Sequence, residues 1–145
     1  MVVLSHCRDL PLSEAEVQSI WDAVCTKTKY KGGEPVAVRC VDEKEIRLLN
    51  QTYRGKDAST NVLTFSYGAE EGHDIALCMS VAIAEARERK ADIRDYAALL
   101  LTHAFLHAAG LDHEHSSEED ARTRSFERAV LTQCGFVSQA LSDVY

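Results

Sequence analysis

Three histidines in the last third of the chain have a spacing that suits metal binding. His103, His107 and His113 follow the pattern H-x3-H-x5-H. Residues four apart lie on the same face of an α-helix, about one turn from each other. Gly110 can adopt the left-handed conformation that ends a helix and turns the chain, which would return His113 to that face. Three neutral imidazoles with one open position for water are the usual ligands of a catalytic zinc ion.

The spacing therefore predicts a Zn²⁺ site on these three histidines. Four of the six histidines fall between positions 103 and 115, and three of the four can converge on one point. His115 lies only two residues after His113 and is better explained as an exposed loop histidine. Nickel, cobalt or copper would bind the same three side chains, although zinc suits them best.

Short strands and helices must hold these histidines in place. Capping signals mark three helix starts, namely Ser13 with Glu16, Asp42 with Glu45, and Ser116 with Glu119. The apolar periodicity predicts helices over about 13–28, 42–53, 80–90, 95–110 and 116–133. Strands are expected at 2–7, 35–41, 61–67 and 74–79, and the last two should pair antiparallel. We expect an α+β (mixed α/β) fold, in which a small mixed sheet of about four strands is covered by about five helices.

The size and composition fit one domain, residues 1–145. The chain has 46% apolar and 27% charged residues, as soluble globular proteins do. Its apolar runs are too short to cross a bilayer, and its first residues do not resemble a secretory signal. The five cysteines are odd in number and scattered, which predicts reduced thiols in the cytoplasm. Cys40 and Cys78 lie in apolar runs and are expected to be small core residues.

The charge is unevenly distributed along the chain. The net charge is −7, but the segment from Cys25 to Lys56 has eight basic residues against four acidic ones. A locally basic face on an acidic protein can follow a phosphate backbone, although a solvated surface without a partner explains the charge equally well. Few aromatic residues lie among these charges, so base stacking is not expected. The candidate RNA-facing residues are Lys27, Lys29, Lys31, Lys44, Arg47 and Lys56.

Three sequence blocks in this order resemble the YbeY family of rRNA maturation factors, which are metal-dependent endoribonucleases. The first block is 49–65, LNQTYRGKDASTNVLTF, and the second is Asp74-Ile75 followed by a helix containing Glu85-Ala86. The third is the histidine block from His103 to His113. Two segments depart from the family pattern, since Leu63-Thr64-Phe65-Ser66 stands for Leu-Ser-Phe-Pro and His73 replaces the glycine of Gly-Asp-Ile.

The resemblance implies a zincin-like metal-binding helix and a hydrolase that cuts single-stranded RNA. Arg54 matches the functionally important arginine of the family, and its planar guanidinium suits a phosphate. His103, His107 and His113 would hold the zinc, and Asp112 would support them from behind. The resemblance also implies a cytoplasmic role in maturing the 3′ end of small-subunit rRNA and in ribosome quality control. Its implied partners are the ribosome, small-subunit ribosomal proteins and an assembly GTPase, with neither DNA nor a membrane among them.

Two other functions share some of these features. Metzincin proteases use the same histidine frame, but they place a glutamate as general base directly after the first histidine. Ala104 occupies that position here, and Met1 and Met79 are the only methionines, so no Met-turn follows. A non-catalytic ribosome-assembly factor with structural zinc is the other alternative. Structural sites usually have four protein ligands and favour cysteine, and no cysteine lies between 103 and 113.

Overall fold

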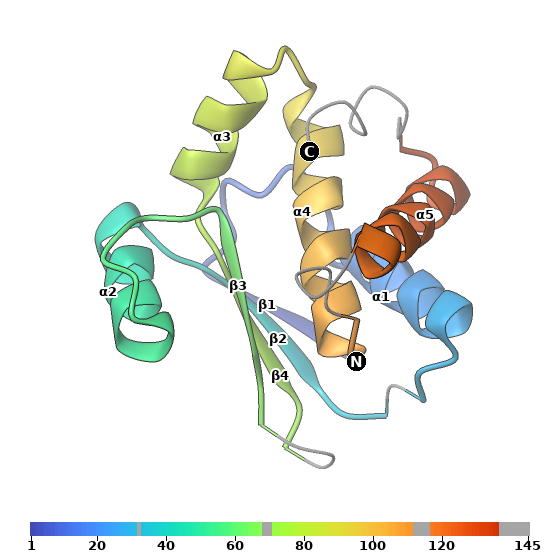
Figure 1. Ribbon diagram of the computed structural model, residues 1–145. Coiled ribbons are helices and arrows are strands. Elements are labelled where there is room, and N and C mark those ends of the chain that lie inside the picture. Colours follow the sequence, from blue (N-terminus) through green and yellow to red (C-terminus); the bar gives the residue numbers. More distant parts are fainter. Residues whose placement is uncertain (32, 68–70, 112–116, 137–145) are drawn as a thin grey trace.

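A computed structural model describes residues 1–31, 33–67, 71–111 and 117–136 of the chain. Within them, four strands and five helices follow one another in the order β1-α1-β2-α2-β3-β4-α3-α4-α5 (Figure 1). The strands are β1 (Val2–Ser5), β2 (Val36–Cys40), β3 (Val62–Ser66) and β4 (His73–Leu77). The helices are α1 (Glu14–Thr28), α2 (Glu43–Arg54), α3 (Met79–Glu88), α4 (Ile93–Ala108) and α5 (Ser117–Gln133).

The strands form one mixed sheet in the order β1-β2-β4-β3. β1, β2 and β4 run parallel, and β3 pairs antiparallel with β4 at one edge. This confirms the expected α+β fold, with its four-stranded mixed sheet, five helices and antiparallel pair. The first strand is shorter than expected, because His6 adopts a left-handed φ of 56° directly after Ser5. The expected cap Ser116 lies outside the described residues.

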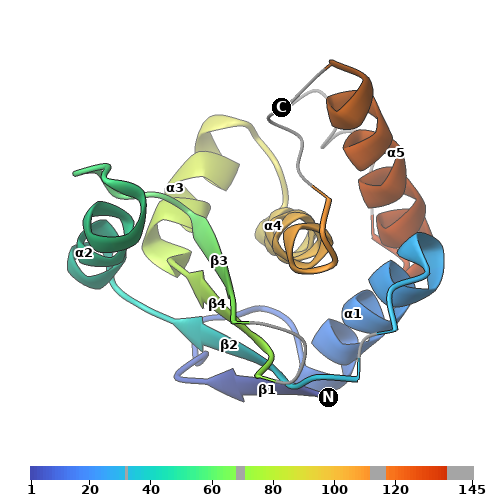
Figure 2. The ribbon, with the colours of Figure 1, turned by 60° about the horizontal axis from the view of Figure 1, so that its bottom comes forward.

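Helices cover both faces of the sheet (Figure 2). On one face, strand side chains such as Val38 and Ile75 pack with α1 and α4 in the larger core. On the other face, Leu63 and Ala76 pack against Ile46 of α2. Cys78 is fully buried, as expected, whereas Cys40 is only half-buried. The two-sided cover explains why the central strands contain continuous apolar runs.

α4 is the central helix of the molecule. Figure 2 shows it nearly end-on, with α1, α3, α5 and the sheet around it. Eleven of its sixteen residues are buried, including Tyr96, Leu101 and Phe105. A helix that is apolar on every side belongs inside a protein, so the sequence 96–106 can only fold with neighbours on all sides. No helix within the described ranges is both long and apolar enough to span a membrane.

His73, which replaces a glycine of the family pattern, is a buried structural residue at the start of β4. Its Nδ1 lies 2.8 Å from the Ser66 hydroxyl, and its Nε2 lies 3.0 Å from the Tyr30 hydroxyl. The Tyr30 hydroxyl also donates to Glu34. The Trp21 ring packs against His73 with 6.0 Å between the ring centroids. Because both ring nitrogens have partners, the imidazole is satisfied inside the protein.

Replacing Ser13 by alanine should destabilise the protein by about 1 kcal/mol, because it removes the capping box of α1. The Ser13 hydroxyl accepts from the Glu16 backbone N–H at 3.1 Å, and Glu16 Oε1 accepts from the Ser13 backbone N–H at 3.0 Å. Urea unfolding measures the loss. Ser19→Ala, an exposed position within the same helix, is the matched control and should be neutral or slightly stabilising. Equal unfolding free energies for the two variants would contradict this role.

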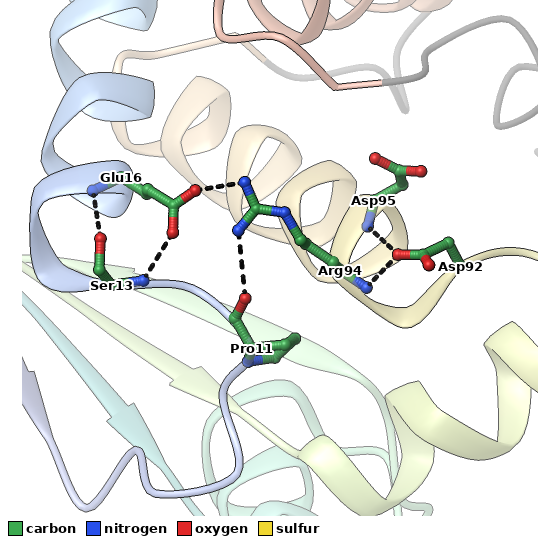
Figure 3. Close-up of polar contacts among 6 residues, drawn as sticks. All are labelled: Pro11, Ser13, Glu16, Asp92, Arg94 and Asp95. Carbon is green, nitrogen blue, oxygen red and sulfur yellow. Dashed lines mark hydrogen bonds and ion pairs between the residues drawn. The ribbon is translucent and has the colours of Figure 1, made fainter.

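An ion pair joins the N-terminal ends of α1 and α4, as Figure 3 shows. Arg94 pairs with Glu16 and also donates to the Pro11 carbonyl, while Asp92 caps α4. The hydrogen bond from Arg94, followed by that from the Ser13 backbone, lowers the pKa of Glu16 from 4.5 to about 2. A carboxyl whose pKa is lowered by folding contributes stability above pH 4.5, and this is lost as the pH falls towards 2.

Arg94→Met should therefore flatten the acid end of the stability profile. Between about pH 6 and about pH 3, the urea midpoint of the variant should fall less than that of the wild type. The effect should be small and weakened by salt, because both side chains are partly exposed. Arg87→Met, at an exposed position on α3, is the control and should keep the wild-type profile. An unchanged profile for Arg94→Met would show that the pair does not act in solution.

Candidate active site

His103 and His107 lie side by side on the C-terminal half of α4. Their ring centroids are 4.5 Å apart and the ring planes are inclined by 48°. Gly110, with a φ of 97°, ends the helix in a Schellman motif. In this motif the Gly110 N–H donates to the His107 carbonyl, and the Leu111 N–H donates to the Leu106 carbonyl. The chain thus turns directly after the second histidine, as the sequence predicts.

A buried glutamate holds His103 from behind. Glu127 of α5 places Oε1 at 2.9 Å from His103 Nδ1, and its side chain is only 3% exposed. A carboxylate at Nδ1 fixes the ring orientation and the tautomer, and so leaves Nε2 as the nitrogen available to a ligand. The sequence gives little sign of this role, because Glu127 lies 24 residues from His103 within a helix that carries many charged residues.

The two histidines line a cleft of about 550 Å³ between α4 and the edge strand β3. Arg54, at the C-terminal end of α2, lines the same cleft. The structure therefore brings together residues that lie about 50 positions apart in the sequence. The lining is completed by polar and apolar side chains of the β3 segment and of the end of α4, namely Thr60, Asn61, Val62, Leu63, Thr64, Ser66, Ala104, Gly110 and Leu111.

Arg54 reaches the cleft because α2 ends directly after it. Gly55 adopts a φ of 69°, which reverses the chain, and its N–H donates to the Gln51 carbonyl at 3.1 Å. The returning segment is held by Asn50, whose buried side chain donates from Nδ2 to the Ala58 carbonyl at 2.9 Å. The Asn50 and Gly55 contacts explain why these residues accompany Arg54 in the first sequence block.

Two further contacts fix the wall of the cleft. The Thr64 hydroxyl of β3 donates to the Ala104 carbonyl at 3.1 Å, which joins the edge strand to α4. Asn61 donates from Nδ2 to Glu85 of α3 at 2.9 Å, and Glu85 also accepts from the Tyr96 hydroxyl at 3.0 Å. Glu85 thereby positions a polar group of the cleft. The sequence singles it out only as part of the second block and assigns it no role.

The other predicted site residues lie elsewhere or beyond the described ranges. His113, Asp112 and His115 lie outside the described residues, so the third ligand and its support stay predictions. The basic residues form two separate exposed groups, not one surface. One group follows the end of α1 and the other lies on and after α2, at the opposite side of the molecule (Figures 1 and 2). The groups are Lys27, Lys29 and Lys31, and Lys44, Arg47 and Lys56.

The donor set fits a zinc ion as far as the structure describes it. Two imidazoles on adjacent turns, one of them held by a carboxylate, form the helical half of a three-histidine site. Among the described residues there is no group of three or more His, Cys, Asp or Glu side chains that could hold a metal. Completing the ligand set therefore depends on His113. With Arg54 opposite, the cleft can receive a phosphate next to the metal position.

Comparisons with known proteins identify the family of this chain. A family model described as Endoribonuclease YbeY matches residues 8–135, which include all the described cleft residues. The chain belongs to the endoribonuclease YbeY family. The family model and the curated relatives are described as endoribonucleases.

Several curated relatives carry the same description. The chain is 43% identical over 103 residues to the Endoribonuclease YbeY of Paracidovorax citrulli, which covers 70% of this chain and 68% of the relative. It is 46% identical to that of Ralstonia nicotianae over 68% of this chain and 54% of the relative. It is 37% identical to that of Burkholderia pseudomallei over 89% of this chain and 69% of the relative. The chain thus spans between about half and about two thirds of the lengths of these YbeY proteins.

A solved structure shows a similar fold. The solution structure of TM1509 from Thermotoga maritima aligns with a TM-score of 0.60 and 28% sequence identity. The alignment covers 92% of this chain and 91% of that protein. Both the arrangement of the sheet and the family membership are thus supported over most of the chain.

Glu127→Gln should weaken Zn²⁺ binding by about 10–100-fold, because the amide replaces the carboxylate that orients His103. Competition with a chromophoric chelator measures the affinity, and circular dichroism reports the fold. Glu88→Gln, the same change at an exposed position of α3, is the control and should bind zinc as the wild type does. An unchanged zinc affinity in Glu127→Gln would show that the carboxylate does not support metal binding.

Proposed function

We propose that this protein is a zinc-dependent endoribonuclease for single-stranded RNA, with His103, His107 and His113 as zinc ligands and Arg54 as phosphate ligand. The observation that carries the proposal is the common cleft. Arg54 from α2 and the two described histidines from α4 line it together. A guanidinium in the same cleft as a pair of imidazoles suited to metal binding fits a phosphodiester, whose oxygens carry negative charge.

The residues of the cleft divide the reaction between them. Zinc, when bound, supplies a water of lowered pKa and a Lewis-acid contact for a phosphoryl oxygen. Arg54 binds the non-bridging oxygens of the scissile or adjacent phosphate and stabilises the charge that grows there in the transition state. Asn61, whose Nδ2 already donates to Glu85, offers the rest of its amide to the sugar or phosphate. The alanine side chain at position 104 cannot transfer a proton. The described lining of the cleft therefore binds the substrate and stabilises charge, but it contains no general base.

The biological context of the proposal comes from the resemblance to YbeY proteins. The expected substrate is ribosomal RNA, at the 3′ end of the small-subunit rRNA, and the expected setting is ribosome maturation and quality control in the cytoplasm. The expected partners are the ribosome, small-subunit ribosomal proteins and an assembly GTPase. A cleft open along the edge strand is consistent with a flexible single strand as substrate. A duplex would have to bring one of its phosphates close to Arg54 and to the histidines at the same time.

Tyr53 gives the proposed RNA site a stacking surface that the sequence does not predict. Its side chain is an exposed large hydrophobic group, with the residue 67% accessible, and it directly precedes Arg54. Its ring packs edge-on against Phe65 of β3, with 5.1 Å between centroids. The contact with Phe65 holds the ring in place while leaving area free, as a base-stacking residue needs. We propose that Tyr53 stacks on a base next to the phosphate held by Arg54.

Arg54→Ala should reduce cleavage of single-stranded RNA by about 100-fold or more, because the charge on the phosphoryl oxygens loses its fixed partner. Zinc content, measured by mass spectrometry of the metal, should stay at the wild-type level. Arg54→Lys should recover only part of the rate, since an ammonium keeps the charge without the planar fork. Arg87→Ala, at an exposed arginine of α3 outside the cleft, is the matched control and should cleave normally.

The metal dependence is tested in the same assay. His107→Ala and treatment with a chelator should each abolish cleavage, and zinc should restore it only in the chelated wild type. Cleavage that survives both treatments would refute the zinc-hydrolase proposal. Tight RNA binding without cleavage under any metal would instead favour the non-catalytic assembly factor.

Tyr53→Ala should weaken RNA binding by about 1–3 kcal/mol, the usual contribution of one stacked base. Tyr53→Phe keeps the ring and should bind RNA as the wild type does. Fluorescence anisotropy with a labelled oligonucleotide, on chelator-treated proteins in which cleavage is prevented and Arg54 is kept, gives the dissociation constants. Equal affinities for the alanine and phenylalanine variants would show that the ring does not contact a base.

A further inference from the structure

Two cysteines that lie far apart in the sequence meet at one end of the sheet. The sulfur of Cys40 lies 2.9 Å from that of Cys7. Cys40 is the last residue of β2, and Cys7 follows β1 by two residues. The two strands run parallel and are paired as far as Ser5 and Arg39. The adjacent strands thereby bring the two cysteines together at the same end of the sheet.

The hydrogen bonds of the pair make the two thiols unequal. The Cys40 thiol donates to the Cys7 sulfur, and this bond is the largest cause that lowers the pKa of Cys7 to about 7. The same bond, together with burial, raises the pKa of Cys40. Because the thiolate is the reacting form, Cys7 is the nucleophile that attacks first, and Cys40 is the thiol that resolves the mixed disulfide on Cys7. A thiol whose pKa lies near the ambient pH combines a high thiolate fraction with good nucleophilicity.

The other cysteines lack such an arrangement. Burial, as the largest cause, raises the pKa of Cys25 to about 11, and burial also raises the pKa of Cys134. Cys78 is fully buried, and its sulfur lies 3.3 Å from the Ser80 hydroxyl. Cys7 is half-buried and is therefore within reach of a small reagent.

We propose that Cys7 and Cys40 form a reactive dithiol site that takes a low-molecular-weight disulfide, of the glutathione disulfide class, as its co-reactant. This site is independent of the RNA-cleaving cleft, because neither cysteine lines it. The pair is also not half of a metal site of the usual kind, since the described residues provide no third His, Cys, Asp or Glu ligand around it.

The reaction balances in two exchange steps. The Cys7 thiolate attacks one sulfur of the small disulfide, whose S–S bond breaks, and the departing thiolate takes up the proton that Cys7 gave to solvent. Cys40 then loses its proton, attacks the Cys7 sulfur and expels the second small thiol. Two protein thiols are oxidised to one disulfide, and one small disulfide is reduced to two thiols.

Closing the bond is compatible with the fold. The sulfurs need only approach from 2.9 Å to the bond length of about 2.05 Å. The bond would connect two strands that are already neighbours, and it would enclose the whole of α1 in a covalent loop. A loop of this kind restricts the unfolded chain, so the oxidised protein should melt at a higher temperature than the reduced one.

The test is to incubate the full-length protein with glutathione disulfide and to measure its intact mass. The expected product lacks the mass of two hydrogen atoms and carries no glutathione. Three of the five cysteines should then still react with iodoacetamide after unfolding, and digestion should yield one cross-linked peptide pair that contains Cys7 and Cys40. In reduced protein, alkylation of Cys7 should have its midpoint near pH 7.

Matched variants separate the site from general oxidation. Cys40→Ala should retain a glutathione adduct on Cys7 and shift the alkylation midpoint of Cys7 upwards, because the hydrogen bond from the Cys40 thiol is lost. Cys25→Ser and Cys134→Ser should form the cross-link as the wild type does. A cross-link that joins Cys40 to Cys78, stable glutathione adducts on the wild type, or a gain of metal mass in place of the disulfide would each overturn the proposal.

Discussion

The burial of α4 is the constraint on which the rest of the structure depends. Apolar side chains of this helix point in every direction and do not form a single stripe opposite a polar face. The helix therefore needs packing partners on all sides. The sheet covers one side, and α1, α3 and α5 cover the others (Figure 2). Between the partly exposed first turn and the C-terminal end the helix lies in the core, and the C-terminal half carries the half-buried His103 and His107. A pair of imidazoles on such a helix is held rigidly, because any movement of the ligands would have to move the core.

The rigid helix also explains how the remaining parts of the cleft are positioned. Three neighbours of α4 contribute polar contacts that position residues of the cleft. α5 provides Glu127 for the His103 ring, and β3 provides the Thr64 hydroxyl for the Ala104 carbonyl. α3 provides Glu85, which holds Asn61. The supporting residues are therefore spread over the whole chain, although the histidines themselves are local in sequence.

This distribution decides what the sequence could predict. The strands, the helices and the histidine pair were predictable, because capping boxes, apolar periodicity and i, i+4 spacing are local signals. The role of the buried Glu127 was not predictable, because nothing in the sequence of its helix distinguishes it from the acidic residues nearby. The separation of the two basic groups was also not predictable. The groups are close in sequence, but one lies at the end of α1 and the other on and after α2, at opposite sides of the sheet. The proximity of Cys7 and Cys40 follows only from the parallel pairing of β1 and β2, which no local pattern encodes.

The residue at position 104 shows how the same metal frame can serve phosphate chemistry. A glutamate after the first histidine would place a negative charge in the cleft, which helps to activate water against a neutral peptide bond. In this chain the position is an alanine with 1% exposure, packed where Thr64 joins the strand to the helix. The described lining of the cleft contains two imidazoles and a guanidinium but no carboxylate. A phosphodiester brings its own negative charge, so a carboxylate at the reacting centre would repel it, whereas Arg54 attracts it. Under the proposed function, the alanine at position 104 and the guanidinium of Arg54 therefore both favour an anionic substrate over a neutral one.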